Sequence, residues 1–300
     1  MVFELMDRNM YEWIKDRKHY LQETRVKHHI YQILKVLDHI HRTGVFHRDI
    51  KPENILLREE TVKLADFGSC RGTMSKQPYT EYISTRWYRS PECLLTDGFY
   101  DYKMDIWGVG CIFFEIMALH PLFPGKNELD MVHQIHRVLG TPPPTLLADF
   151  QRHATHMEFD FPYTEGTGLD VLLPHMSPEG VTILGKMLMY DSTFRPTAKG
   201  LLKSAYFRDI REQDMALTEI QIVRPVHFRT SQEENDGGEH FAQTLPRIPA
   251  QAKATVELPS IHKAYKQKFK VKKSGLEIRG FGKTRKFPSP VKRNPDKVYI

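Results

Sequence analysis

The chain has 300 residues, of which 40% are hydrophobic and 11% aromatic, and its formal net charge is +6. This composition excludes wholesale disorder, and the length allows one large domain or two small ones with a substantial core. The best candidate for a membrane span, GVGCIFFEIMAL, contains Glu115 and is shorter than the about 20 residues that cross a bilayer. The start, MVFELMD, does not match a secretory signal, and the three cysteines lack zinc-site spacing. We therefore expect an intracellular protein with reduced thiols and no membrane span.

A long amphipathic helix is predicted over residues 20–41. Six apolar residues recur there at helical spacing: Val26, Ile30, Ile33, Leu34, Leu37 and Ile40. Gly44 follows as a stop signal, and the next segment contains the short apolar runs VF, ILL and VKLA between charged turns. Pro52 excludes a continuous helix through the first of these turns. The stretch HRDIKPEN, residues 47–54, is therefore expected to be a loop held between buried strands.

Three further helices are predicted after residue 100. Residues 105–119 are apolar nearly all round, which indicates a buried central helix. Residues 121–144 hold a helix bracketed by prolines. Another is expected from Ser177 to Tyr190, with Ser177 as its N-cap and Pro178 at the first helical position. Before them, residues 69–92 are polar and without a period, which is typical of a functional segment.

The chain changes character after Phe207. An acidic linker, SQEENDGGEH, is followed by a Lys-rich sequence that is punctuated by prolines. Residues 263–297 carry thirteen Lys and Arg against Glu277 and Asp296, so this segment has a net charge of +11 and the rest about −5. We place the domain boundary near residue 207 and expect residues 208–300 to be a basic, disordered tail. The KQKFKVKK run is compatible with nucleic-acid phosphates, but we favour a solvated tail or a nuclear import signal.

The order and spacing of several motifs carry more information than any one of them. HRD alone could be a solvated surface corner. Here Asp49 is followed five residues later by Asn54 and twelve residues after that by Asp66 in DFG, and then come SPE at 90–92 and DIWGVG at 105–110. This series resembles the eukaryotic protein kinases, whose signature includes H-R-D-x-x-x-x-N, D-F-G and A-P-E. A satisfied surface turn is the alternative interpretation.

The resemblance implies a Ser/Thr protein kinase that transfers the γ-phosphate of ATP to protein Ser or Thr side chains. Asp49 would accept the proton of the substrate hydroxyl, and Asn54 and Asp66 would hold Mg²⁺. Lys51 matches the position at which Ser/Thr kinases place a cation against the transferring phosphate. ATP and Mg²⁺ are therefore the implied cofactors.

A second resemblance concerns regulation. TEY at 80–82 matches the activation-loop T-x-Y of the mitogen-activated protein kinases, which implies phosphorylation of Thr80 and Tyr82. Thr85 matches the residue that hydrogen-bonds the catalytic Asp and Lys, and Arg89 implies a pocket that favours proline after the phosphorylated residue. A polar loop that is never modified is the alternative. The implied partners of the phosphates are Arg48, Arg71, Arg86 and Arg89.

Three residues are implied to be structural. Glu92 and Arg195 would form the buried ion pair of the family, and Asp105 would brace the backbone of the catalytic loop. Ser90 stands where the family motif usually has Ala, a change between small residues that we expect to be tolerated.

MVFELMD resembles the kinase hinge, where the backbone around Glu4 and Met6 would bind adenine, with Asn9 near the ribose and Leu56 in the adenine site. No glycine-rich loop, V-A-I-K lysine or partner glutamate precedes it. We therefore expect a protein kinase-like α+β fold over residues 1–207 that consists of the hinge and a mostly helical C-terminal lobe with short strands, without the N-terminal sheet. Such a chain is expected to transfer phosphate slowly or not at all by itself. A catalytically dead, kinase-derived binding module is the alternative.

Further motifs indicate which branch of the protein kinases the chain resembles. The segment GKNELDMVHQIHRVLGTPPP resembles the insert of the cyclin-dependent and mitogen-activated branch. KPEN, DFGSCR and SKQPYTEYISTRWYR resemble the kinase family to which the male germ cell-associated and intestinal cell kinases are related. This implies protein substrates with Ser/Thr-Pro sites, an upstream kinase and chaperones as partners, and a location in the cytoplasm, the nucleus and the cilium. Nucleic acid is not expected as a partner.

Overall fold

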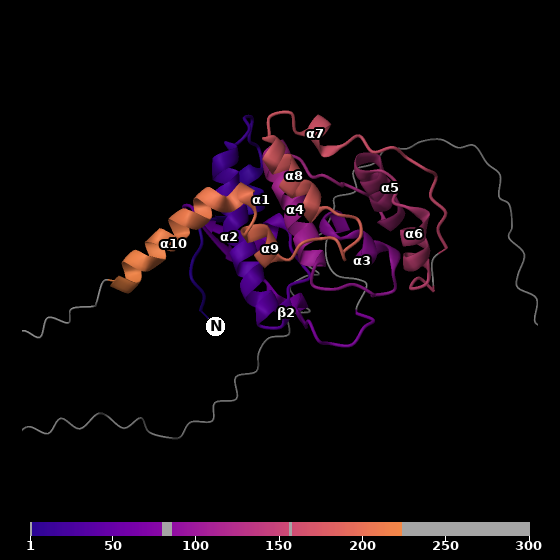
Figure 1. Cartoon of the computed structure of the whole chain (residues 1–300), viewed down its shortest axis with the longest axis horizontal. Coiled ribbons are helices and arrows are strands. Elements are labelled where there is room, and N and C mark those ends of the chain that lie inside the picture. The colour runs from indigo at the N-terminus through magenta and orange to yellow at the C-terminus, as the bar shows by residue number, and fades with distance from the viewer. Residues whose placement is uncertain (1, 80–85, 156–157, 224–300) are drawn as a thin grey trace, which may run out of the picture. The chain divides into compact units, whose positions relative to one another are not determined.

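Helices dominate the computed structural model, which describes residues 2–79, 86–155 and 158–223 (Figure 1). The longer helices are α2 (Glu23–Arg42), α4 (Met104–Ala118), α5 (Glu128–Leu139), α6 (Pro144–Gln151), α8 (Pro178–Met187) and α10 (Arg208–Val223). Short helices of four or five residues are α1 (Met10–Ile14), α3 (Pro91–Leu95), α7 (Leu169–Leu172) and α9 (Ala198–Leu202). Four single 3-10 turns occur at Pro52–Asn54, Phe67–Ser69, Arg86–Tyr88 and Ala205–Phe207.

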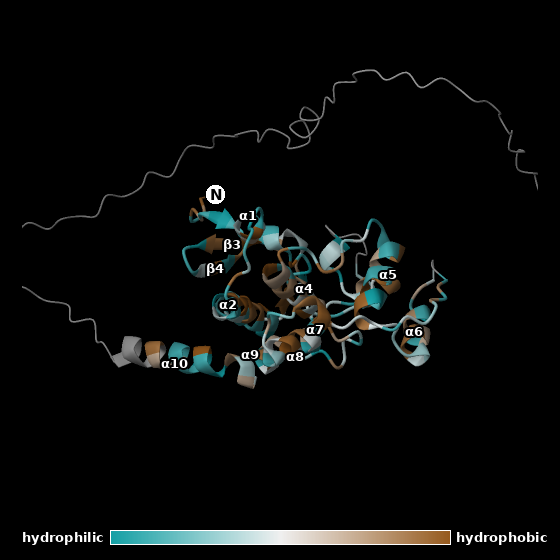
Figure 2. Cartoon of the chain, turned by 90° about the horizontal axis from the view of Figure 1, so that it is seen from above, coloured by the Kyte–Doolittle hydropathy of each residue, from teal (hydrophilic) through white to brown (hydrophobic). Residues whose placement is uncertain are grey.

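Two small antiparallel sheets complete the fold. The first has the order β1 (Arg8–Asn9), β3 (Ile55–Arg58), β4 (Thr61–Leu64), and the second pairs β2 (Val45–Phe46) with β5 (Arg71–Gly72). These strands confirm the predicted VF and ILL runs and all of the predicted VKLA run except Ala65, which follows the end of β4. Figures 1 and 2 place α1 and α2 at the opposite side of the molecule from α5 and α6, and in Figure 2 the strands β3 and β4 lie on the α1 side.

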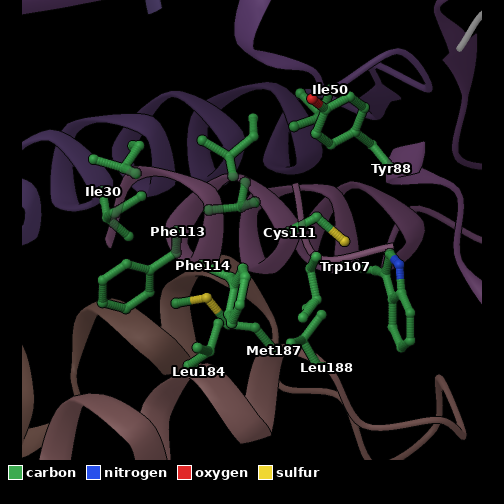
Figure 3. Packing of buried hydrophobic residues seen from close by; sticks show 14 of the residues in the cluster. Ile30, Ile50, Tyr88, Trp107, Cys111, Phe113, Phe114, Leu184, Met187 and Leu188 are labelled. Carbon is green, nitrogen blue, oxygen red and sulfur yellow. The ribbon is translucent and has the colours of Figure 1, made fainter. Parts of the chain in front are cut away.

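The helix α4 forms the centre of the core, as predicted. Every residue from Met104 to Ala118 is buried. The helix lies between α2 and α8, and Phe113, Phe114 and Leu184 meet at its contact with α8 (Figure 3). On the other side, the predicted apolar stripe of α2 is buried from Val26 to Ile40. Burying apolar side chains at about 25 cal/mol per Å² is the main force that holds these three helices together.

The ends of α2 and α8 follow the sequence signals. Gly44 adopts a left-handed φ of +84°, a conformation that favours glycine. Because this conformation is not α-helical, the helix cannot continue beyond this residue. Ser177 caps α8, because its Oγ accepts a hydrogen bond from Gly180 N at 3.0 Å. The same hydroxyl donates to Glu23 at 2.6 Å, so one glutamate ties the start of α8 to the start of α2. The helix α8 ends at Met187, three residues before the predicted end.

Residues 208–223 correct one expectation. They were predicted as part of a disordered tail but form the helix α10. Lys27 Nζ bonds Asp209 at 2.6 Å and Lys35 Nζ bonds Asp214 at 2.8 Å, so α10 is attached to α2 by charge. This pairing is not visible as an apolar period in the sequence. The rest of the predicted tail lies outside the described residues, and the residues described here all belong to a single compact unit that spans residues 1–229.

No helix in the described part of the chain combines the length and the apolar character that a membrane crossing requires.

Replacing Phe113 by Ala should destabilise the fold strongly. Its side chain is fully buried in the contact between α4 and its neighbours, and a Phe→Ala cavity typically costs about 3–5 kcal/mol. Phe194, which is 70% exposed, offers a matched control, and Phe194→Ala should cost no more than about 0.5 kcal/mol. Urea unfolding followed by circular dichroism measures both. Equal losses in the two variants would contradict the assignment of α4 as the core.

Candidate active site

The loop that carries Asp49 is held by one buried carboxylate. Asp105, in the first turn of α4, accepts hydrogen bonds from His47 N at 2.8 Å and from Arg48 N at 2.8 Å. His41 Nε2 lies 2.9 Å from the same carboxylate. Asp105 is 1% exposed, so these bonds replace the water that it has lost. Arg48 has a left-handed φ of +71°. This conformation is strained in a residue other than glycine, and the hydrogen bonds to Asp105 stabilise it.

His47 joins this loop to the segment that carries Asp66. Its ring is fully buried, and Nε2 lies 3.0 Å from the carbonyl oxygen of Ala65. Nδ1 accepts a hydrogen bond from Asp49 N at 3.3 Å, which assigns the proton to Nε2. The ring also meets Phe67 edge to face, with centroids 5.2 Å apart. His47 was not among the residues predicted to form the site, although its position in HRD, directly after the apolar residues Val45 and Phe46, was the available signal.

Asp49 lies in a cluster with two of the residues predicted beside it. Lys51 Nζ donates to Asp49 Oδ2 at 2.8 Å, and Asn54 Nδ2 donates to the same atom at 3.0 Å. Asn54 Nδ2 also donates to the backbone oxygen of Asp49 at 2.8 Å. Asp49 is 8% exposed and Asn54 7%, so the carboxylate has few other donors. An oriented carboxylate with a cation beside it can accept a proton from a hydroxyl group while the cation stabilises developing negative charge.

The oxygen atoms of Asn54 and Asp66 suit a hard cation. Asn54 Nδ2 donates to Asp49, whereas no described residue donates a hydrogen bond to Asn54 Oδ1, so this oxygen is available as a ligand. Ala65 N donates to Asn54 O at 2.9 Å, which places Asp66 one residue beyond this contact. Asp66 is exposed, has a φ of +61°, and accepts from Gly68 N at 3.3 Å. Mg²⁺ prefers such oxygen ligands and keeps several waters. No group of three or more His, Cys, Asp or Glu suited to a metal occurs within the described residues.

The predicted hinge residues lie beside the first sheet. Asn9 pairs with Leu56 in the register of β1 and β3, so these two predicted residues are adjacent. Asn9 is also the N-cap of α1, because its Oδ1 accepts from Glu12 N at 2.8 Å. Glu12 returns a bond to Asn9 N at 3.1 Å, which completes a capping box. The side-chain oxygen of Asn9, the residue expected near a ribose, is therefore engaged with the backbone of α1.

The Glu4 side chain forms salt bridges with two basic residues of the β3–β4 hairpin. It pairs with Lys63 and, at 3.4 Å, with Arg58. The hydrogen bond and charge of Lys63 lower the pKa of Glu4. Met6 is half-buried in the same segment. Three apolar side chains here are largely exposed: Val2 (98%), Phe3 (79%) and Leu5 (88%).

The four predicted phosphate-pairing arginines separate into two groups. Arg48 is 5% exposed, its Nε and Nη1 atoms have no hydrogen-bond partner among the described residues, and its guanidinium lies 5.9 Å from the ring centroids of Tyr79 and Tyr100. Arg71 lies on β5, opposite Phe46 in the register. By contrast, two arginines are each 3.5 Å from Glu128 at the start of α5, namely Arg86 and Arg89. Thr80, Tyr82 and Thr85 lie outside the described residues.

Glu92 and Arg195 form a buried two-bond ion pair. The two bonds measure 2.7 and 3.1 Å, and the residues are 3% and 1% exposed. Arg195 also donates to Met189 O at 3.1 Å and to Lys103 O at 3.0 Å. Its guanidinium therefore has partners for its remaining donors, which a buried charge requires.

Glu115, in α4, is a second buried carboxylate, and in the sequence it only argued against a membrane span. It is 5% exposed and accepts a hydrogen bond from Tyr88 Oη at 2.8 Å. Burial raises the pKa of Glu115 to about 7, and the negative charge of Glu53 adds to this rise. A single glutamate within an otherwise apolar helix was the signal available in the sequence.

Known proteins resemble the chain over this region. A family described as "Protein kinase domain" matches residues 1–207. The chain is 53% identical over 214 residues to MAPK/MAK/MRK overlapping kinase of Homo sapiens, covering 71% of this chain and 51% of that protein. It is 43% identical over 208 residues to Serine/threonine-protein kinase ICK of Rattus norvegicus and 44% identical over 208 residues to Serine/threonine-protein kinase MAK of Homo sapiens. Each of these two alignments covers 69% of this chain and 33% of the relative. The chain thus spans between a third and about half of the length of these relatives.

Breaking the Glu92–Arg195 ion pair should lower the free energy of unfolding strongly. Arg195→Ala leaves the Glu92 carboxylate buried without its counter-charge, which typically costs about 3–5 kcal/mol. The double variant Glu92→Gln, Arg195→Met should lose less, because no unpaired charge remains. Urea unfolding measures both, with Arg42→Ala at the exposed Asp38–Arg42 pair as the control that should cost less than about 1 kcal/mol. A loss for Arg195→Ala no larger than the control would contradict this account.

Glu115 should make stability depend on pH. Its pKa is raised from 4.5 to about 7 in the folded protein. Between these values the folded state holds a proton that the unfolded state has released, so stability falls as pH rises from 4.5 to 7, by about 3 kcal/mol in total, and is constant above. Glu115→Gln should remove this slope and the exposed control Glu165→Gln should not. Urea unfolding at pH 5, 6, 7 and 8 compares the three proteins, and parallel curves would refute the assignment.

Proposed function

The chain belongs to the protein kinase family, and from that premise we propose that it transfers the γ-phosphate of ATP to serine and threonine side chains of proteins. One observation carries the proposal: Asp49 Oδ2 is bonded by Lys51 at 2.8 Å and by Asn54 at 3.0 Å, in a loop whose backbone is fixed by Asp105. The relatives that share this region are named serine/threonine-protein kinases.

Each residue of the cluster has one task. Asp49 receives the proton of the substrate hydroxyl group. The Lys51 ammonium group stabilises the negative charge on the phosphoryl group that is being transferred. Asn54 Oδ1 and Asp66 would hold Mg²⁺, which neutralises the phosphate oxygens when bound. His47 fixes the position of the Asp49 loop relative to the segment that carries Asp66, because its ring contacts the backbone of both. Pre-oriented charge of this kind is worth factors of 10² or more in rate per group.

Phosphates on Thr80 and Tyr82 would regulate this site. Arg48 supports the proposal, because its Nε and Nη1 atoms are buried without hydrogen-bond partners among the described residues. A phosphate brings about −1.5 to −2 charge and three acceptor oxygens, which suit such a guanidinium. Arg71 is the second candidate partner. Arg86 and Arg89 are less suited, since Glu128 already faces both.

The resemblance extends the proposal to substrates and location. Arg89 would favour proline after the phosphorylated residue, with Thr85 bonding Asp49 and Lys51. The partners would be proteins with Ser/Thr-Pro sites, an upstream kinase and chaperones, and the protein would work in the cytoplasm, the nucleus and the cilium.

A binding module without catalysis is the second candidate. Val2, Phe3 and Leu5 expose apolar surface beside the predicted hinge, which a partner could cover. Such a module would bind kinase substrates or regulators through the same loop.

Asp49→Asn separates the two candidates. Loss of the proton acceptor should lower phosphate transfer to a generic basic protein substrate by about 10²-fold or more. Asp160→Asn changes an exposed aspartate in the same way and should leave the rate within about twofold of the wild type. A radiometric assay with labelled ATP measures all three proteins. Undiminished transfer by Asp49→Asn would contradict the proposed role, and binding of substrates with no transfer by any of the three would favour the module.

A further inference from the structure

A small cleft lies where the end of α2 meets α9. The two helices pack against each other (Figure 1), and the cleft between them has a volume of about 280 Å³. His41 and Arg42 of α2, Tyr102 before α4 and Lys199 of α9 are among the residues that line it. None of the residues proposed to act on ATP, Mg²⁺ or the substrate lines this cleft, so it is separate from the candidate active site.

His41 gives the cleft a buried polar atom that is not satisfied. Its side chain is 8% exposed, and Nε2 lies 2.9 Å from Asp105 Oδ2. Because a carboxylate only accepts hydrogen bonds, Nε2 carries the proton, and Nδ1 of the neutral ring is an acceptor. This Nδ1 atom is buried and has no hydrogen-bond partner among the described residues. A ligand that donates a hydrogen bond to Nδ1 would therefore remove the free-energy cost of an unsatisfied buried acceptor.

Aromatic rings form part of the wall. The rings of His41 and Tyr102 meet edge to face, with centroids 5.0 Å apart and planes inclined by 65°. Ala198 adds an apolar surface from α9. Rings arranged in this way present both a face and an edge to a further aromatic ring. Pockets for drug-sized ligands usually measure about 300–1,000 Å³, so a cleft of about 280 Å³ suits a molecule with a single ring.

The charged side chains of the cleft favour an anion. Arg42 Nε pairs with Asp38 Oδ2 at 2.9 Å, while the Nη atoms of Arg42 bond no residue that the structure describes. Lys199 is exposed and has no acidic partner within the described part of the chain. Two cations against one carboxylate leave a positive charge at the cleft, which attracts anionic ligands. The planar guanidinium of an arginine also matches the geometry of a carboxylate.

We propose that this cleft binds a small aromatic carboxylate that also carries a hydroxyl group. The hydroxyl group donates a hydrogen bond to His41 Nδ1, the aromatic ring packs against His41 and Tyr102, and the carboxylate pairs with Arg42 and Lys199. This binding site goes beyond the proposed phosphate transfer and does not depend on it.

The ligand would also act on the loop that carries Asp49. His41 bonds Asp105, and the Asp105 carboxylate accepts hydrogen bonds from His47 N and Arg48 N at 2.8 Å each. Hydrogen bonds in a chain polarise one another, so a bond to Nδ1 makes Nε2 a stronger donor to Asp105. A molecule in the cleft should therefore hold the backbone before Asp49 more firmly.

Nuclear magnetic resonance of the full chain tests the binding, with para-hydroxybenzoate as the probe. With isotope-labelled histidine, the Nδ1 signal of His41, identified by its loss in His41→Gln, should shift as the probe is added. Benzoate lacks the donor and should bind about fivefold more weakly. The uncharged para-hydroxybenzamide should bind at least about tenfold more weakly than para-hydroxybenzoate.

A matched pair of lysine variants locates the charge. Lys199→Glu should weaken binding of para-hydroxybenzoate at least about tenfold, because it places a like charge beside the carboxylate. Lys186→Glu makes the same change at an exposed residue of α8 that does not line the cleft, and it should leave the affinity within about twofold of the wild type. A His41 signal that does not move, equal affinities for benzoate and para-hydroxybenzoate, or an unchanged affinity in Lys199→Glu would each overturn the proposal. The comparison of probes leaves the protein intact, so it decides the matter even if a variant fails to fold.

Hydrogen exchange followed by mass spectrometry tests the effect on the loop. At saturating para-hydroxybenzoate the amides of His47 and Arg48 should exchange at least about twofold more slowly in the wild type and in Lys186→Glu. At the same probe concentration Lys199→Glu should show no change. Binding without slower exchange would overturn the link through Asp105. Neither experiment uses ATP, so a negative result here would leave the proposed function standing, and a chain that transfers no phosphate could still bind the probe.

Discussion

The site depends on the bonds between the Asp105 carboxylate and the backbone of the loop before Asp49. Two N–H groups of this loop, at His47 and Arg48, point at one carboxylate in the interior, and Arg48 holds a left-handed φ of +71°. Without Asp105 both donors would be buried and unsatisfied. Because Asp105 belongs to a helix whose every residue is buried, the packing of the whole lobe fixes the position of Asp49.

Buried charge in this molecule is of two kinds. Glu92 and Arg195 satisfy each other, and Asp105 is surrounded by donors, so these groups hold the fold. Glu115 accepts a hydrogen bond from Tyr88, whereas the Nε and Nη1 atoms of Arg48 lack hydrogen-bond partners within the described residues. Leaving these donors unsatisfied costs free energy, so Arg48 is the place where a bound phosphate gains most.

Arg48 is the residue directly before Asp49, so the proposed activating phosphate would bind beside the proton acceptor, on the loop that Asp105 holds.

The sequence by itself determined α2 from its apolar period, α4 from its nearly continuous apolar run, and α8 from its Ser177–Pro178 start. It also indicated the helix within residues 121–144 and the three short strands. It also set the order of the motifs, because their spacing is a property of the chain. Only the tertiary structure decided which groups meet: His47 with Ala65, Glu115 with Tyr88, and Asn9 with the backbone of α1. It also placed the helix of residues 208–223 against α2, where Asp209 pairs with Lys27 and Asp214 with Lys35. Local periodicity records which face of a segment is apolar, whereas a contact between side chains that are distant in sequence exists only after the core has brought them together.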